Sequence, residues 1–398
     1  MHKLKKIQEN KKINWLLFFG ILLIGANLRA PITSVGVALP SIKNDLSLSN
    51  TTVSFIAIVP LLSFSIISLL AAKTSNWIGL EKTIFGALIL ILIGVVIRSF
   101  PNVSWLYIGT ILLGIGIAFG NVLTPSIIKL KFPLRIGIMT GYYSVVMNIL
   151  GSVSSYSTSP LIKMFNYNIA LMLISIITIC ALIIWSFQLK NNQNNMESIK
   201  KSNMNIWKSP IAWKITLLMG GQSLIFYSLI NWLPEYLTDY GISITLAGTY
   251  LSILQLSSIP LTFITPIWAA KMKSQVSIAI LTGSMFVVGT LAMMFFPNLA
   301  IISVIVLGIA SGLSFGLVNT FFSLRTEEGV TAAKLSGMSQ AIGYLFAAIG
   351  PMFFGVLHDV TNNWYASLSI LLVTSIAILI FSSSAGRNET IEYRQYYS

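Results

Sequence analysis

The chain has 398 residues, of which 55% are hydrophobic and 9% are charged. A soluble globular chain carries roughly a quarter charged residues, so this composition excludes an ordinary soluble enzyme or binding domain. The net charge of +14 has the sign that a nucleic-acid partner requires, but the basic residues are spaced between long uncharged stretches, which indicates membrane insertion and no nucleic-acid partner.

Uncharged stretches long enough to cross a bilayer recur along the whole chain. A hydrocarbon core of ~30 Å needs about 20 helical residues, and turn-forming residues separate the apolar runs. The first run is longer than the core of a signal peptide and lacks a small-residue cleavage site, so we expect a retained helix. The predicted segments lie near residues 13–39, 49–72, 83–100, 104–128, 136–161, 167–189, 213–236, 245–269, 275–296, 299–323, 333–357 and 363–384. They predict an all-α polytopic membrane protein with twelve transmembrane helices.

The basic residues fall largely on one side of these segments. With both termini in the cytoplasm, the outer side receives only Lys43, Arg98 and Lys163. Arg29 lies inside the membrane, and the rest of the 25 Lys and Arg residues are cytoplasmic. Such a bias sets orientation through the positive-inside rule. We therefore expect a multi-pass protein of the cell membrane, in a bacterial cytoplasmic membrane, with the lipid bilayer as its surroundings and both termini cytoplasmic.

The second half of the chain repeats features of the first in the same order. Leu39-Pro40 and Leu233-Pro234 each precede an aspartate and a serine at the same spacings, and Pro60-Leu61 and Pro260-Leu261 each lead into an Ala-Ala-Lys sequence. Transporters that rock two halves around a midplane site have such repeats. The predicted organisation is an N-terminal six-helix bundle (13–189), a polar cytoplasmic linker (190–210) and a C-terminal six-helix bundle (211–385), with cytoplasmic tails at 1–12 and 386–398.

Several motifs are similar to those of a known transporter family. They are Gly-Ala-Asn-Leu-Arg-Ala-Pro-Ile-Thr-Ser-Val-Gly at 25–36, Asn-Val-Leu-Thr-Pro-Ser-Ile-Ile-Lys at 121–129, Met-Thr-Gly-Tyr-Tyr at 139–143, Leu-Ser-Gly-Met-Ser-Gln at 335–340, Gly350-Pro351 and His358-Asp359. Through them the chain, from about Asn14 to Trp364, resembles the major facilitator superfamily, and within it the branch of cyanate permeases and 2-nitroimidazole transporters. The resemblance implies the major facilitator fold of two six-helix repeats and transport by alternating access.

The superfamily's acidic signature between the second and third helices is incomplete in this chain. Asn76 stands where the resemblance leads us to expect an aspartate, while the residues at 79–82, Gly-Leu-Glu-Lys, are retained. Gly141 and Gly337 stand at repeated positions on the fifth and eleventh segments, where small residues let helices pack and slide closely. The residues assigned to gating or packing are Gly79, Glu81, Lys82, Gly141 and Gly337.

Arg29 is the only charged residue that the pattern places deep within a segment, and no segment offers a deep carboxylate to neutralise it. Burying an unpaired guanidinium there costs at least ~2.5–3.5 kcal/mol. A substrate anion held by the planar guanidinium fork would supply the missing charge, and the resemblance points to the same residue. In the structural alternative, Arg29 snorkels outward or bonds backbone carbonyls near Pro31.

Further polar and aromatic residues fall where a central cavity would be lined. Some such side chains contact a ligand, and others only bond neighbouring helices, at ~0.6 kcal/mol each. Tyr143, Gln222 and Tyr227 carry amide or phenol donors that suit an anion, and Tyr143 and Tyr344 can also stack on a flat ligand. The predicted substrate-binding residues are Arg29, Asn27, Asn121, Tyr143, Gln222, Tyr227, Gln255, Asn319, Gln340 and Tyr344.

The acidic residues lie at the ends of the predicted segments, so we do not expect proton coupling through a buried carboxylate. Facilitated anion movement, anion exchange, and symport in which the anion itself carries the proton are all compatible with the sequence. We interpret His358, beside Asp359, as a cap and not as a proton relay. The chain shows no phosphate-binding loop, zinc spacing or nucleophile elbow, and its single cysteine, Cys180, cannot form an internal disulfide or a metal cluster. We therefore predict no enzyme activity, cofactor or metal.

Three functions are weighed on these observations. The leading hypothesis is a secondary active or facilitative transporter, working as a monomer, that moves a small cyanate-like anion or a small polar organic solute. The first alternative is an efflux transporter for small flat organic drugs such as nitroimidazoles. The second, from another class, is a non-transporting membrane receptor or sensor.

Overall fold

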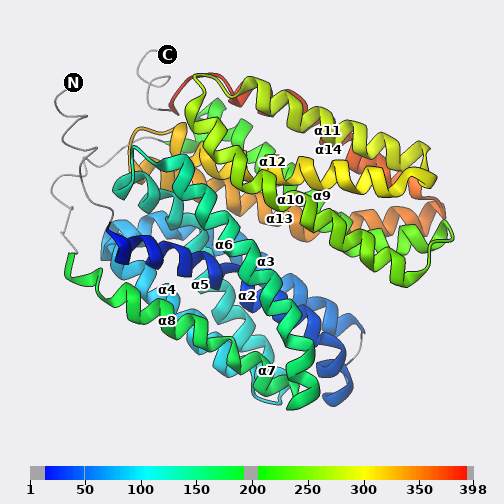
Figure 1. The fold of residues 1–398 in the computed structure, drawn as a ribbon, viewed down its shortest axis with the longest axis horizontal. Helices are drawn as coiled ribbons and strands as arrows, with labels where there is room; N and C mark the ends of the chain where they lie inside the picture. The colour runs from blue at the N-terminus through cyan, green and yellow to red at the C-terminus, as the bar shows by residue number, and fades with distance from the viewer. Residues whose placement is uncertain (1–13, 49, 192–204, 392–398) are drawn as a thin grey trace. The chain divides into compact units, whose positions relative to one another are not determined.

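The computed structural model of the chain describes residues 14–48, 50–191 and 205–391. Over these residues it is built of α-helices and three short 3-10 turns (Figure 1). The α-helices are α2 (Trp15–Asp45), α3 (Asn50–Ile78), α4 (Leu80–Arg98), α5 (Val103–Lys131), α6 (Ile136–Met164), α7 (Tyr167–Leu173), α8 (Ser175–Ser186), α9 (Pro210–Asp239), α10 (Ile244–Lys271), α11 (Val276–Phe295), α12 (Ala300–Leu324), α13 (Gly329–Thr361) and α14 (Trp364–Ala385). The predicted tail at 1–12, most of the linker at 190–210 and the end of the tail at 386–398 lie outside the described residues.

Eleven spans in the described part of the chain are long and apolar enough to cross a membrane, with α7 and α8 together forming the span Tyr167–Ser186. α9 is long but less apolar, because polar residues such as Gln222 and Asn231 interrupt its apolar sequence. With α9, the helices match the segments expected from the sequence one for one. The predicted class of an all-α polytopic membrane protein is confirmed.

The structure differs from the prediction mainly at helix ends. α2 continues to Asp45 instead of residue 39, and α13 covers Gly329–Thr361 instead of 333–357, because polar residues at the ends of a helix extend it without extending its apolar run. The predicted sixth segment is divided at Ile174. There the amides of Ile174 and Ile177 each donate to a carbonyl three residues back, which is the hydrogen-bond spacing of a 3-10 turn.

Contacts divide the chain into two compact units. The first holds residues up to Pro60 and Lys73–Lys200, and the second holds Leu61–Ala72 and the residues from Lys201 onward. The middle of α3 therefore packs with the second unit. There Ser65 Oγ donates to Ala341 O at 2.6 Å. The bundle boundaries at 13–189 and 211–385 stay a prediction.

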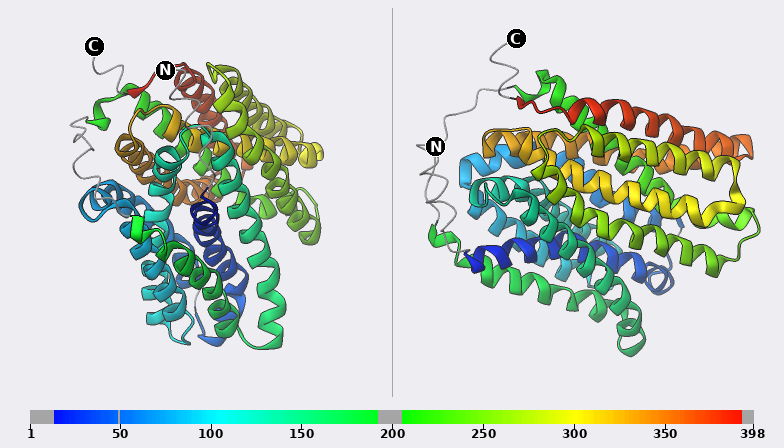
Figure 2. Two further views of the ribbon diagram at one scale, coloured as in Figure 1. Left: turned by 60° about the vertical axis from the view of Figure 1, so that its left-hand side comes forward. Right: turned by 45° about the horizontal axis from the view of Figure 1, so that its top comes forward.

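Close helix pairs build the first unit. Gly109 of α5 approaches α4 so closely that a Cβ there would stand 2.4 Å from Arg98 N. α2 and α6 run side by side (Figure 1, Figure 2), and Ser154 Oγ of α6 donates to Ala30 O at 3.0 Å. Small residues permit this approach of backbones in membrane helices, and the two pairs fix the positions of α2, α4, α5 and α6.

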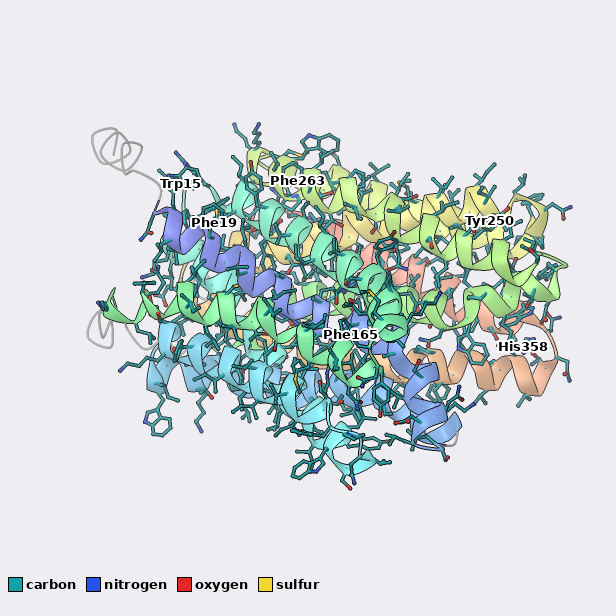
Figure 3. All side chains as sticks on the ribbon, turned by 60° about the horizontal axis from the view of Figure 1, so that its bottom comes forward. Trp15, Phe19, Phe165, Tyr250, Phe263 and His358 are labelled. Atoms are coloured by element: carbon teal, nitrogen blue, oxygen red, sulfur yellow. The ribbon has the colours of Figure 1, made fainter. Side chains whose placement is uncertain are left out.

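Matching ties fasten the ends of α2 and α9. Tyr167 donates to the Asp45 carboxylate at 3.0 Å in the first unit, and Trp364 Nε1 donates to the Asp239 carboxylate at 2.9 Å in the second. His358, at the end of α13 (Figure 3), stacks on Trp364 with ring centroids 3.8 Å apart, and its Nε2 lies 3.8 Å from Asp239. In both units, an aspartate at a helix end accepts from an aromatic side chain that opens a later helix.

A second matching pair lies at the starts of α4 and α11. Lys131 Nζ pairs with the Glu81 carboxylate at 2.8 Å, and Arg325 Nη2 donates to Gln275 Oε1. One sequence offset relates Glu81 to Gln275 and Lys131 to Arg325. The repeat that the proline pairs indicate thus includes the side chains that tie each unit together.

Exposed aromatic rings mark several helix ends. Trp15 and Phe19 project from the first two turns of α2, and Phe165 follows α6 (Figure 3). Aromatic side chains of this kind gather at the boundary between lipid and water, so their placement agrees with helices that cross a bilayer.

Candidate functional site

Arg29 lies on α2 where that helix packs on α6. Its side chain is half-buried, and the stem crosses Gly151, where a Cβ would stand 2.6 Å from Arg29 Cγ. One turn further along α2, Thr33 Oγ1 donates to Gly151 O at 2.8 Å. Gly151 therefore makes room for the arginine stem, and the α2–α6 contact fixes the face of α2 from which the guanidinium extends.

Tyr143 of α6 lies beside the same part of α2. Its ring packs on Gly25, where a Cβ would stand 3.0 Å from Tyr143 Cδ2, and the side chain is buried. Its hydroxyl lies near the Thr124 hydroxyl of α5 and within electrostatic reach of Arg29. Thr124 Oγ1 donates to Gly120 O of its own helix at 2.6 Å.

Three helices thus place a guanidinium, a phenol and a threonine hydroxyl together. No Asp or Glu occurs in α5 or α6, and α2 carries only Asp45, its last residue. Asp45 stands about 24 Å along the helix axis from Arg29. A fixed positive charge beside hydroxyl groups, on helices that bring no nearby carboxylate, is chemically suited to hold an anion.

Asn27 lies on the α8 side of α2, whereas Arg29 lies on the α6 side. Its Nδ2 donates to Leu23 O at 2.8 Å and to Ile177 O at 3.4 Å, and Thr178 Oγ1 of α8 donates to its Oδ1 at 2.5 Å. Two residues apart on a helix, Asn27 and Arg29 point about 160° away from each other. The structure therefore assigns Asn27 a tie between α2 and α8 and does not bring it to the Arg29 cluster.

Sequence reasoning missed part of this cluster. Asn121 is half-buried on α5, one turn before Thr124, and Thr124 is the residue that meets Tyr143. The exposed Tyr142 packs instead on Phe18, with ring centroids 5.7 Å apart. The available signal for Thr124 was its place within the motif at 121–129, but a threonine that bonds its own helix looks the same in sequence as one that also faces a site.

The second unit brings two of the predicted glutamines onto packed helices. α9 and α13 are joined by Thr216 and Ser339, whose hydroxyls lie 3.0 Å apart. Gln222 of α9 is buried and donates to Ser223 Oγ at 2.9 Å. Gln340 of α13 is buried and donates to Ser336 Oγ at 2.7 Å, while its Oε1 meets no donor among the described residues. Each glutamine is thus oriented by a serine of its own helix.

The other predicted residues of the second unit have separate surroundings. Tyr344 of α13 meets the Phe64 ring edge to face at 5.0 Å, and Tyr227 packs on Phe226 at 5.6 Å. Asn319 Nδ2 donates to Phe315 O of its own helix at 2.9 Å. Gln255 is exposed on α10. These contacts do not gather the residues into one cluster.

The predicted gating residues surround the start of α4. Gly79 has a φ of 101°, a left-handed conformation that favours glycine at this turn. Glu81 is buried and pairs with Lys131, and Lys82 is exposed. Gly141 and Gly337 are buried in α6 and α13. Their role in gating stays a prediction.

The structure corrects the expectation that Arg29 is the only charged residue buried within the helices. Arg98, assigned to the outer surface from its place at a segment end, is 0% exposed, and Arg325 is 2% exposed. The Cα–Cβ bonds of a helix tilt toward its N-terminus, so a long side chain on the last turn of α4 lies back over the preceding turn. Burial lowers the pKa of Arg325 to about 10, which leaves it protonated at neutral pH.

Membrane-spanning helices that enclose buried polar and cationic side chains are the architecture of a membrane transporter of small solutes. The sequence profile of the Major Facilitator Superfamily matches residues 17–348, and the chain belongs to this family. Among the described residues, no group of three or more His, Cys, Asp or Glu side chains could hold a metal ion.

Curated relatives extend over nearly the whole chain. The uncharacterized transporter YycB of Bacillus subtilis (strain 168) is 39% identical over 389 residues, 96% of each chain. The 2-nitroimidazole transporter of Escherichia coli (strain K12) is 36% identical over 379 residues, 94% of this chain and 96% of that protein. The cyanate transport protein CynX of the same strain is 22% identical over 365 residues, 91% of this chain and 95% of that protein. The resemblance read from the sequence motifs is confirmed.

A solved structure shows the same fold. The proton:xylose symporter XylE bound to 6-bromo-6-deoxy-D-glucose matches with a TM-score of 0.80 at 13% identity, over 96% of this chain and 98% of that chain. The predicted fold class of twelve transmembrane helices in two six-helix repeats is confirmed.

Proposed function

We propose that this transporter moves a small anion, or a small polar solute with an anionic group, by alternating access, with Arg29 as the anion anchor. The observation that carries the proposal is the cluster of Arg29, Tyr143 and Thr124 on three helices that bring no nearby carboxylate. A guanidinium held half-buried at a helix contact gains most from a ligand that supplies the opposite charge. The name of CynX, a cyanate transport protein, agrees with a small anion.

The same cluster constrains the coupling mechanism. Proton-coupled transporters commonly titrate a carboxylate within the membrane span, and α2, α5 and α6 carry no Asp or Glu near Arg29. We therefore propose facilitated anion movement, anion exchange or symport of the protonated anion. A counterflow assay in proteoliposomes, with and without a pH gradient, separates these modes.

A proteoliposome uptake assay tests the anchor directly. Arg29→Ala is expected to abolish saturable uptake of the anion, and Arg29→Lys to weaken it, because lysine keeps the charge but loses the planar fork. Arg135→Ala is the matched control, since Arg135 is an exposed arginine at the start of α6. Unchanged uptake of every candidate anion by both Arg29 variants would overturn the proposal.

A second candidate function is efflux of small flat organic compounds. The specific observation in its favour is the 36% identity to a protein named as a 2-nitroimidazole transporter. Tyr344 is half-buried in the second unit, where its ring packs on the buried Phe64, and its remaining aromatic surface suits a flat ring. Efflux predicts that deletion sensitises cells to nitroimidazoles while anion uptake stays normal, and the anion proposal predicts the reverse.

We also propose that the protein lies in a bacterial cytoplasmic membrane as a monomer, with both termini cytoplasmic and no nucleic-acid partner. The placement of its basic residues supports this orientation through the positive-inside rule. In a Cys180→Ser background, Lys163→Cys should react with an impermeant thiol reagent from outside intact cells, and Lys273→Cys should not. Both lysines are exposed, so equal labelling would contradict the orientation. Light scattering of the purified protein measures the oligomeric state.

A further inference from the structure

Arg98 is a second buried guanidinium in the first unit, and the proposed function does not use it. It is the last residue of α4, and its side chain is 0% exposed. The neighbouring α5 holds the backbone at this point, since a Cβ on Gly109 would stand 2.4 Å from Arg98 N and 2.6 Å from Arg98 Cβ. The backbone therefore has little room to shift, and the side chain lies inside the unit.

The guanidinium has little to bond there. Its one hydrogen bond within the described residues runs from Nη2 to Ser34 Oγ of α2 at the long distance of 3.5 Å. Nε and Nη1 are buried and meet no acceptor among the described residues. Ser34 Oγ donates in turn to Pro31 O at 3.1 Å. Its hydroxyl is neutral and does not offset the charge of the arginine.

The described carboxylates of the first unit are engaged elsewhere. These are Asp45 and Glu81. Asp45 accepts from Tyr167, and Glu81, at the opposite end of α4 from Arg98, pairs with Lys131. A charge enclosed without a partner is strongly unfavourable, and neither carboxylate compensates Arg98.

The Arg98 position is separate from the Arg29 cluster. Ser34, which Arg98 contacts, follows Arg29 by five residues on α2. That spacing places the two contacts about 7.5 Å apart along the helix and about 140° apart around it. Arg29 extends toward α6 and is half-buried, whereas Arg98 meets α2 from α4 and is fully enclosed. An anion at Arg98 would not share the site proposed for the transported solute.

We propose that Arg98 binds a small monovalent anion of halide size within the first unit, between α2 and α4, as a fixed structural ion that is not transported. Nε and Nη1 offer two charged donors, and the Ser34 hydroxyl can rotate to offer a third. Full enclosure favours a monatomic ion over a larger one, and a single negative charge neutralises the guanidinium without leaving a net buried charge. This inference does not depend on the proposed function.

Thermal unfolding of the purified protein tests the proposal. An ion that binds only the folded state raises the melting temperature by mass action, so chloride or bromide should raise it by several degrees over gluconate at equal ionic strength. Arg98→Met keeps a long, flexible side chain of similar length and removes the charge. It should lose the halide response and melt above the wild type in gluconate but not in chloride. Arg29→Ala should keep the halide response.

Two results would overturn the proposal. One is a wild-type melting temperature that is the same in chloride, bromide and gluconate, with Arg98→Met more stable in all three. That result would mean that the buried charge destabilises the protein and binds no anion. The other is an equal rise for wild type and Arg98→Met, in sulfate as in chloride, which would be a general salt effect. If Arg98→Met does not fold, crystals of the wild type grown in bromide decide the question. An anomalous peak within hydrogen-bond distance of Arg98 supports the site, and an empty map at that place rejects it.

Discussion

Tyr142 and Tyr143 are adjacent in sequence, but their hydroxyls have different surroundings. Tyr143 is buried against Gly25, with its hydroxyl near Thr124 and within reach of Arg29. Tyr142 is exposed and packs its ring on Phe18. On a helix, neighbours point about 100° apart, so Tyr143 faces Gly25 and α5, whereas Tyr142 contacts Phe18 nearer the start of α2. The pair therefore provides an internal control for a role of the hydroxyl in anion binding.

Tyr143→Phe is expected to raise the KM for the transported anion roughly tenfold, equivalent to about 1.4 kcal/mol, because one hydrogen bond to a charged group is lost. The phenylalanine ring still fills the space on Gly25, so the melting temperature should change little. Uptake kinetics and thermal melts of the purified protein measure the two quantities. Tyr142→Phe is the control and should alter neither; an equal KM change in both variants would show that the hydroxyl of Tyr143 has no special part.

The sequence singles out residues whose chemistry is rare in a membrane, but it does not reveal side-chain directions that packing alone decides. Arg29 and Tyr143 could be selected because a guanidinium and a phenol in an apolar segment need a reason to be there. Asn27 met the same criterion, yet the structure turns it toward Thr178. Arg98 was placed outside because it ends a segment, although its side chain lies inside. The direction of a side chain depends on helix rotation, which composition does not reveal.

At the scale of single elements, α4 and α5 form the tightest described pair of the first unit. A Cβ on Gly94 would stand 2.5 Å from Leu113 N, and one on Gly109 would stand 2.4 Å from Arg98 N. Both obstacles are backbone atoms, which cannot rotate away as a side chain can. Gly86, on the same α4, has nothing within 4 Å of its would-be Cβ. α4 thus contains one glycine that packing requires, Gly94, and one that packing does not require, Gly86.

Gly109→Ala is expected to destabilise the protein by about 1–3 kcal/mol, the usual cost of inserting a methyl group into a filled interior. It should also disturb Arg98, whose backbone it would displace. Gly86→Ala should be neutral or stabilising by up to about 1 kcal/mol, since alanine is the better helix former. Thermal melts of the two variants in the same detergent make the comparison. A Gly86→Ala variant less stable than Gly109→Ala would contradict the observed packing.

The sequence predicts which segments form helices, but it does not predict where a helix breaks or which helix it packs against. Long apolar runs bounded by turn residues are unambiguous signals of spanning helices, and each predicted segment has a helix. The break at Ile174 lies between Leu173 and Ser175, and no charged residue, glycine or proline marks it. The pairing of α3's middle with the second unit was also unpredictable, because Ser65 and Phe64 look like ordinary residues of a span and acquire their partners, Ala341 and Tyr344, from far along the chain.

At the scale of the whole molecule, the two halves place side-chain contacts at equivalent positions but make them with different residue types. The proline pairs revealed the repeat, and the structure shows that it also relates Glu81–Lys131 to Gln275–Arg325. The first pair is partly open to water, with side chains 11% and 33% exposed. In the second, Arg325 is buried and also donates to Ala385 O at 2.9 Å and Gly386 O at 3.0 Å. Equivalent positions therefore hold an ion pair in one half. In the other half they hold a cation that donates to neutral acceptors, with the Glu389 carboxylate within electrostatic reach.

The identity of the residue at position 275 follows from what each side chain can donate. Gln275 accepts from Arg325, and its Nε2 also donates to Ala269 O and to Met272 O, each at 2.9 Å, at the end of α10. A glutamate could accept from Arg325, but it could not donate to Ala269 O and Met272 O. Its negative charge would instead face these two carbonyl oxygens. The Glu81 carboxylate only accepts hydrogen bonds and so has no comparable donor role. Its backbone oxygen accepts from Trp185 Nε1 at 2.9 Å.

Isosteric exchanges at the two repeated positions should therefore have unequal effects. Gln275→Glu is expected to destabilise by about 1–3 kcal/mol despite gaining an ion pair with Arg325, because the buried Ala269 carbonyl and the partly buried Met272 carbonyl lose their donor. Glu81→Gln should cost less, because Lys131 is partly exposed to water and a glutamine can still accept from its ammonium group. Melting temperatures measured at low and high salt compare them, and only the Glu81→Gln difference should shrink as salt rises. If Gln275→Glu proved the more stable of the two, the charge on Arg325 would outweigh its hydrogen-bond network, and the neutral tie of the second half would need another explanation.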